Sequence, residues 1–159
     1  MKGARVAVLW HAADRTRDRS RYLVTRLAPF WRAWGADVID VFGPDAREPA
    51  DLAILHVDLS VVPGPYLARA ASYPRAVNGA VGDIRKSCFS RLIVAPDDAW
   101  TGPVIVKTEL NNGGHPERRR TGMLGRLRRT RMRSAGDYLV FDRLEDVPRE
   151  MVRDPALVI

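Results

Sequence analysis

Cysteine, lysine and histidine are scarce in this 159-residue chain, which has one cysteine, three lysines and three histidines. A single cysteine excludes an intramolecular disulfide and a metal cluster built from cysteines. Long apolar runs are also missing: none approaches the roughly 18 residues of a membrane helix, and residues 6–10 are too short for the apolar core of a secretory signal. We therefore expect a cytoplasmic protein without a membrane partner. Cys88 has apolar neighbours, which favours a core position over a nucleophilic role.

The three histidines, His11, His56 and His115, are far apart and have no spacing typical of a zinc site. His11 and His56 fall at or near the carboxyl ends of predicted parallel strands, where open α/β sheets bind ligands. Asp58 shares that edge with His56, so contact with a substrate is one interpretation of the pair. We favour the other interpretation, histidines in the core with satisfied hydrogen bonds.

Arginine supplies 23 of the 26 basic residues, so the positions that keep lysine are informative. Lys86 lies in a predicted helix, and Lys107 ends an apolar, β-branched run directly before the polar turn Asn111-Asn112-Gly113-Gly114. An ammonium is a compact point charge that suits phosphate, whereas arginine presents a wide planar fork. Chance remains the alternative for so small a number of lysines.

The turn at residues 111–114 has two compatible interpretations. Backbone amides of a glycine-containing loop can surround an anion that Lys107 neutralises. The second interpretation is a β-hairpin turn, since Asn-Gly is the typical hairpin signal. The spacing differs from the phosphate loop of mononucleotide-binding NTPases, and no Gly-x-Gly-x-x-Gly follows the first strand, which disfavours a dinucleotide site.

Positive charge is concentrated in residues 117–133, which contain eight arginines and one glutamate. The net charge of the whole chain, +7, equals that of this segment. Basic and acidic residues are therefore equal in number in the rest of the chain. Such a segment attracts RNA, DNA or an anionic surface, and weak non-specific nucleic-acid binding is one expectation. The segment contains no aromatic residue to stack on bases, so we favour a solvated helix of a lid lobe.

Apolar periodicity predicts an alternation of strands and helices. Residues 5–10, 36–42, 52–57 and 75–78 are typical of strands, and residues 66–72 of a short helix. The stretch from Leu23 to Trp34 has the apolar spacing of an amphipathic helix, with Pro29 inside it. Gly35 is expected to end this helix in the left-handed backbone conformation. Short connections predict a parallel sheet with right-handed crossovers.

The second half of the chain has a different pattern. A helix over residues 83–92, capped by Asp83, is expected first. Apolar runs at residues 104–107, 138–141 and 157–159 then predict strands. The last run has the character of a strand interrupted within a sheet, which predicts a lobe that is incomplete at its C-terminus.

Residues 103–114, Pro-Val-Ile-Val-Lys-Thr-Glu-Leu-Asn-Asn-Gly-Gly, resemble the strand and glycine-rich loop that open the lid lobe of the ATP-grasp superfamily. Residues 73–78 and 83–86 are similar to the asparagine and the lysine-bearing helix near the end of the family's first lobe, most of all in its glutathione synthetase-like branch. The resemblance implies an α/β fold: a parallel-sheet pre-ATP-grasp lobe over residues 1–85 and a partial α+β ATP-grasp lid lobe over residues 86–159.

The resemblance also implies roles for individual residues. Lys107 would contact the α- and β-phosphates of ATP, and Lys86 the nucleotide from the neighbouring lobe. The loop Asn111-Asn112-Gly113-Gly114 would belong to the same site, with its glycines closing over the γ-phosphate.

The family's second large lobe and its magnesium-binding acidic and asparagine side chains have no counterpart in the chain, so we assign no catalytic and no metal-ligating residue. The implied function is the ATP-binding N-terminal portion of a carboxylate–amine or carboxylate–thiol ligase, catalytically incomplete alone, with a small-molecule carboxylate as substrate. The alternative is a basic nucleic-acid-binding module that uses residues 117–133.

Overall fold

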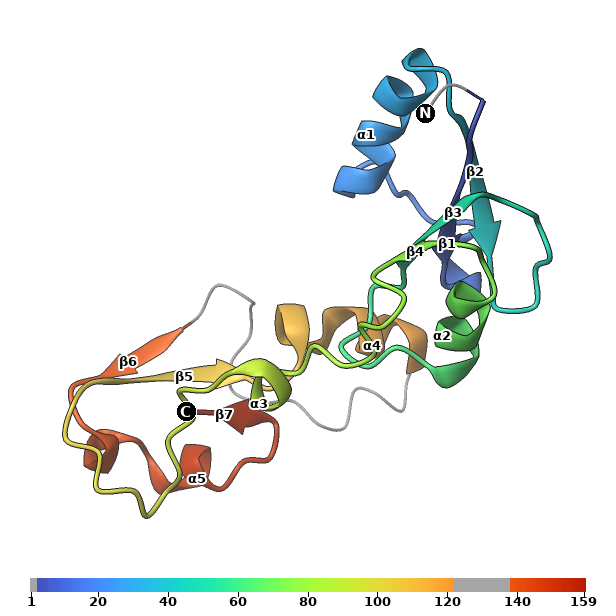
Figure 1. Ribbon diagram of the computed structural model, residues 1–159. Helices are drawn as coiled ribbons and strands as arrows, with labels where there is room; N and C mark the ends of the chain where they lie inside the picture. The colour runs from blue at the N-terminus through green and yellow to red at the C-terminus, as the bar shows by residue number, and fades with distance from the viewer. Residues whose placement is uncertain (1–2, 122–137) are drawn as a thin grey trace. The chain divides into compact units, whose positions relative to one another are not determined.

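The computed structural model describes residues 3–121 and 138–159, and the chain divides into two compact units (Figure 1). The first unit comprises residues 1–58 and 62–82, and the second comprises residues 59–61 and 83–159. The architecture is mixed α/β. The first unit contains a four-stranded parallel sheet, and the second contains a three-stranded antiparallel sheet.

The predicted alternation of strands and helices is confirmed in the first unit. Its elements are β1 (Arg5–Trp10), the 3-10 turn η1 (Ala12–Asp14), α1 (Leu23–Ala33), β2 (Asp37–Phe42), β3 (Leu52–His56), α2 (Gly64–Ala71) and β4 (Ala76–Val77). The strand order is β2-β1-β3-β4, and every pairing is parallel. The crossover through α1 leads from β1 to β2, towards one edge of the sheet. The crossover through α2 leads from β3 to β4, towards the opposite edge. Two right-handed crossovers therefore place the helices on opposite faces, and the strand order reverses between β1 and β3.

The alternation of side chains along β1 produces the two-sided core. Val6, Val8 and Trp10 pack with Val24 and Ala28 of α1 on one face, while the intervening side chains point to the opposite face. All five residues of β1 after Arg5 are buried, as expected of a central strand that is covered on both sides.

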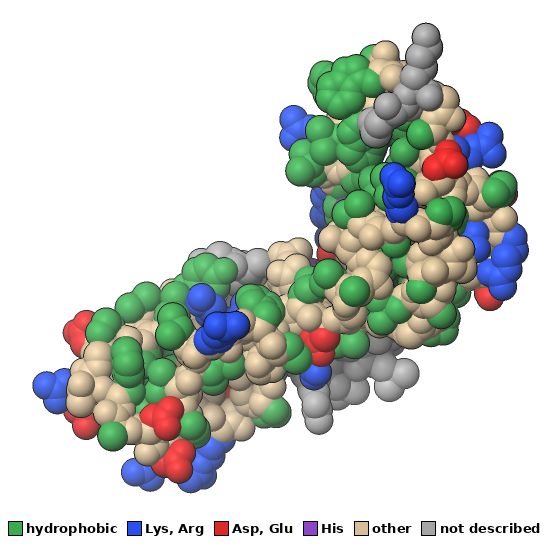
Figure 2. Space-filling view, viewed as in Figure 1, with side chains coloured by type: hydrophobic (Ala, Val, Ile, Leu, Met, Phe, Trp, Pro, Cys, Tyr) green, Lys and Arg blue, Asp and Glu red, His purple; other side chains and the backbone are tan. Residues whose placement is uncertain are grey.

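Helix α1 continues through Pro29, and Gly35 adopts the left-handed conformation with φ 87°, as expected. The apolar stripe of α1 differs from the expectation of a core-facing surface. Leu23, Phe30 and Trp34 are 68%, 62% and 66% exposed, and the helix is anchored by smaller side chains. Figure 2 shows hydrophobic side chains gathered on the surface over α1. The sheet buries a narrow part of the helix surface, so most of the periodic residues lie outside the core.

The segment after β1 is held over the sheet edge by Arg19. The Arg19 guanidinium lies 5.2 Å from the Trp10 ring centroid and 4.7 Å from that of Phe42. Its Nη1 donates to the backbone oxygen of Asp14 at 2.7 Å, and its Nη2 lies 3.3 Å from Asp40 Oδ2. Asp40 also accepts a 2.8 Å bond from the Trp10 indole N–H, so the cation, the two rings and the carboxylate form one cluster.

The predicted strands of the second half are also confirmed. The elements of the second unit are α3 (Lys86–Phe89), β5 (Val104–Thr108), η2 (Asn111–Gly114), α4 (His115–Thr121), β6 (Leu139–Phe141), η4 (Leu144–Asp146), α5 (Arg149–Val152) and β7 (Leu157–Val158). Strand β5 is central and pairs antiparallel with β6 and β7. Val104 and Val106 of β5 pack on Leu144 and Val147 to form the core of this unit.

Two local expectations for residues 83–92 were wrong. Helix α3 is a single turn that begins at Lys86, and the Asp83 carboxylate binds Arg85 instead of capping a long helix. This side-chain bond and the Arg85 backbone N–H hold the pKa of Asp83 far below its usual range. Cys88, expected in the core, is exposed because so short a helix has no buried face. Among residues 3–121 and 138–159, none of the helices is long and apolar enough to cross a membrane.

Candidate functional site: a pocket with two lysines

Strand alternation on β5 places Lys107 at a pocket. Val104, Val106 and Thr108 are buried, whereas Ile105 and Lys107 point to the other face of the strand. That face lines a cavity of about 280 Å³ in the second unit, which we call the two-lysine pocket. Its walls come from α3, β5, β7 and the segments next to them; the lining residues are Lys86, Phe89, Ser90, Leu92, Ile93, Ile105, Lys107, Tyr138, Val158 and Ile159.

Lys86 reaches the same pocket from the first residue of α3. Its Nζ donates to the Leu110 backbone oxygen at 3.0 Å, and its backbone N–H donates to the oxygen of Glu109 at 3.1 Å. An ammonium has three N–H groups, so two remain for a ligand after the bond to Leu110. Burial lowers the pKa of Lys86; the Glu109 carboxylate opposes this shift, and the positive charge of Lys107 adds to it.

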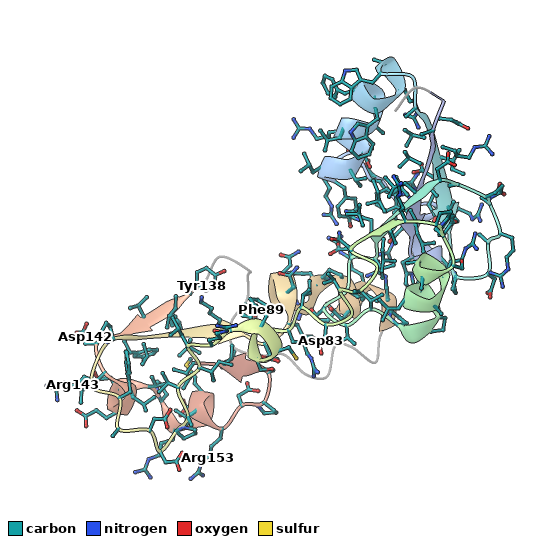
Figure 3. The ribbon with its side chains drawn as sticks, in the orientation of Figure 1. Asp83, Phe89, Tyr138, Asp142, Arg143 and Arg153 are labelled. Carbon is teal, nitrogen blue, oxygen red and sulfur yellow. The ribbon has the colours of Figure 1, made fainter. Side chains whose placement is uncertain are left out.

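Aromatic and aliphatic side chains complete the walls. Lys107 Nζ lies 5.4 Å from the centroid of the Tyr138 ring, within range of a cation–π interaction. Phe89 of α3 supplies a second ring (Figure 3). Two cations next to flat apolar surfaces suit an anion attached to an aromatic group. Neither ring was predicted as a site residue from the sequence, because nothing in the local pattern distinguishes them from ordinary surface aromatics.

The glycine-containing turn, residues 111–114, is not the β-hairpin turn that its Asn-Gly dipeptide suggested. It forms the 3-10 turn η2 that leads directly into α4, so it is not a hairpin tip. Asn112, Gly113 and Gly114 all have positive φ (49°, 61° and 70°). Gly114 is buried, and a Cβ there would lie 3.0 Å from Leu110 Cδ1. Within the described residues, none of the four turn residues lines the two-lysine pocket.

Ser60 fixes the position of this turn. Its side chain is buried, and its Oγ accepts the Asn111 N–H at 2.8 Å. The Ser60 N–H donates to Glu117 Oε1 at 2.6 Å, and its carbonyl accepts from the Ile84 N–H at 2.8 Å. Three segments of the second unit thus meet on one serine, which the sequence does not distinguish from any other.

Most of the arginine-rich segment, residues 122–133, lies outside the described residues. The described part belongs to α4. There Arg118 Nη1 donates to the Gly113 oxygen at 2.5 Å, and Arg119 is exposed. Arg118 thus holds the backbone of η2.

The histidines of the first unit lie at the carboxyl edge of the parallel sheet, where the sequence predicted them. The His56 ring lies 4.6 Å from the Trp10 ring and 4.7 Å from the Tyr22 ring, between centroids. The Tyr22 hydroxyl donates to Asp58 Oδ2 at 2.7 Å. The His11 ring stacks on Tyr66 at 5.4 Å. His56 and Asp58 are therefore linked through Tyr22. His56 Nδ1 has no hydrogen-bond partner among the described residues, so His56 is not the fully satisfied histidine that was expected.

Stability of the first unit is expected to fall on acidification because of His56. Burial lowers the pKa of His56 below its usual value of 6.5. Below pH 6.5 the unfolded chain therefore takes up a proton that the folded chain resists, and the free energy of unfolding decreases with falling pH. Denaturant titrations between pH 7.5 and 5.5 test this. In the His56→Gln variant the free energy of unfolding should depend less steeply on pH. An unchanged pH dependence would contradict its assignment to His56.

Among the residues that the structure describes, no three His, Cys, Asp or Glu side chains converge in a way that would hold a metal ion. The two-lysine pocket, together with the sequence pattern around it, is therefore the candidate functional site. Comparisons of the chain with protein-family models, with curated proteins and with solved structures gave no match.

Proposed function

We propose that the second unit binds ATP in the two-lysine pocket. The observation that carries the proposal is the convergence of Lys86 and Lys107, two of the chain's three lysines, on one pocket with aromatic and aliphatic walls. The ammonium groups would hold phosphate oxygens through charge-assisted hydrogen bonds. The rings of Phe89 and Tyr138 and the aliphatic side chain of Ile105 would pack against the base.

The resemblance to the ATP-grasp superfamily supplies the wider proposal. The chain would be the ATP-binding portion of a ligase in which ATP activates a carboxylate for attack by an amine or a thiol. In this scheme Lys107 contacts the α- and β-phosphates, and Lys86 approaches from the other wall of the pocket. Magnesium belongs to that chemistry, but no group of three His, Cys, Asp or Glu side chains converges among the described residues, and no step of the reaction is assigned to it.

The glycines of η2 would contribute through Lys86 rather than by direct contact. Lys86 Nζ is bonded to the oxygen of Leu110, the residue directly before the turn. The conformation of η2 therefore bears on the position of one of the two phosphate-binding cations. Closure of Gly113 and Gly114 over the γ-phosphate, as the resemblance implies, would require the turn to move towards the pocket.

Isothermal titration calorimetry with ATP, adenosine and tripolyphosphate tests the function. We expect ATP to bind at least tenfold more tightly than either fragment, since only the whole molecule can use both the cations and the apolar wall. A single-stranded RNA should bind in the non-specific range, with a Kd of about 10⁻⁴–10⁻⁶ M near 0.15 M salt. Nanomolar affinity for one RNA over scrambled controls, without ATP binding, would instead establish the alternative function of the arginine-rich segment.

A further inference from the structure

The first unit contains a second pocket, of about 450 Å³, on the face of the parallel sheet that carries α1. Helix α1 lines it with Leu23, Leu27 and Trp31, which are spaced four residues apart and so lie in one row along the helix. Strand β3 lines it with Leu52, Ile54 and His56, which alternate with buried residues and so share one face of the strand.

The pocket exists because α1 covers only part of its sheet face. The helix packs chiefly on β2, and its residues Val24 and Ala28 meet the core face of β1. In the sheet register Val6 lies beside Leu52, so the β3 row continues the same face beyond the helix. The row remains half-exposed, whereas Ala53 and Leu55 on the opposite face are buried.

Two polar residues, His56 and Asn78, interrupt the apolar lining. His56 Nδ1 is buried and has no hydrogen-bond partner within the described part of the chain. In the neutral tautomer that carries its proton on Nε2, Nδ1 is an acceptor. A buried acceptor without a partner is costly, and native proteins rarely leave one unsatisfied. The other polar lining residue is Asn78, next to Val77, and among residues 3–121 and 138–159 no Lys, Arg, Asp or Glu lines the pocket.

We propose that this pocket binds a small uncharged molecule with an aromatic or branched aliphatic body and one N–H or O–H group that donates to His56 Nδ1. Its volume falls within the usual range of about 300–1,000 Å³ for small-molecule sites, and an apolar lining with one or two placed polar groups is typical of them. An apolar lining of this kind does not favour a phosphate-bearing ligand. The site is therefore independent of the two-lysine pocket.

Indole and indene are matched probes, because they share a bicyclic shape and only indole carries an N–H donor. Titration of the isotope-labelled 159-residue chain, followed by amide NMR, should show saturable indole binding with shifts centred on α1 and β3. Indole should bind about fivefold more tightly than indene, the factor for one net hydrogen bond. No saturable binding would overturn the proposal, and so would equal affinity for the two probes, since His56 would then make no bond to the ligand.

Two phenylalanine substitutions locate the site. Val77→Phe adds a ring at a residue that lines the pocket and should weaken indole binding at least tenfold. Val81→Phe is the control: its exposed fraction, 44%, matches the 46% of Val77, but it does not line the pocket. Equal losses in both variants would overturn the location. Sedimentation that shows a dimer abolished by Val77→Phe would assign the face to a second copy of the chain, which also overturns the small-molecule proposal.

Discussion

Replacing Lys107 with alanine is expected to weaken ATP binding by about 1.5–3 kcal/mol, the range for a lost hydrogen bond to a charged group. This corresponds to a Kd about 10 to 150 times higher. Lys107 lines the two-lysine pocket beside Ile105, and its ammonium lies over the Tyr138 ring, so truncation removes a cation without opening the core on the other face of β5. Calorimetric titration of the full chain measures the effect.

Four further variants make this experiment discriminating. Lys107→Arg should recover part of the affinity at most, because a planar guanidinium cannot occupy the place of a compact ammonium. Lys86→Ala should also weaken binding, and the double variant should lose less than the sum of the two, since neighbouring groups that hold one ligand are coupled. Arg153→Ala removes one exposed positive charge from the same unit outside the pocket (Figure 3) and should bind ATP as the wild type does. Wild-type affinity in Lys107→Ala would exclude this residue from the site.

Replacing Trp10 with alanine is expected to destabilise the first unit by about 3–5 kcal/mol, the usual loss for truncation of a buried tryptophan. Trp10 is 1% exposed, and its ring contacts Tyr22 and His56. Truncation would also remove the surface over which Arg19 lies. Hydrogen exchange measured by mass spectrometry should show faster exchange in peptides of β1, β2 and β3.

The same measurement contains its own controls. Peptides from β5 and α5 belong to the other unit and should keep their protection in Trp10→Ala. Trp34→Ala removes the same side chain from a position that is 66% exposed, and its cost should stay within about 0.5 kcal/mol. Comparable losses of protection in the two tryptophan variants would mean that burial does not decide the stability of this unit.

Much of the first unit could be predicted from the sequence because its signals are local. Strand β1 begins and ends where the apolar run does, and Gly35 ends α1 with the expected positive φ. The short connections between strands and helices permitted few topologies other than a parallel sheet. The face of α1 that packs was not predictable, since periodicity identifies an apolar stripe but not how much of it the sheet covers.

The second unit was less predictable because its structure depends on contacts between distant segments. The turn at residues 111–114 contains the typical hairpin dipeptide, yet Ser60 binds its first amide and the chain enters α4. Asp83 was expected to cap a helix, but the Arg85 side chain next to it competes for the same carboxylate. In both places a partner that local propensity does not include decided the conformation.

The sequence by itself determined the order of strands and helices, the parallel class of the first sheet and the placement of Lys107 at the end of a strand, because these depend on residue periodicity and backbone preference. The tertiary structure alone decided that Lys86 and Lys107 share one pocket with Tyr138, and that His56 lies in a half-covered apolar groove. Contacts between residues far apart in sequence depend on which faces of the strands and helices are buried. The packing of the whole unit determines those faces.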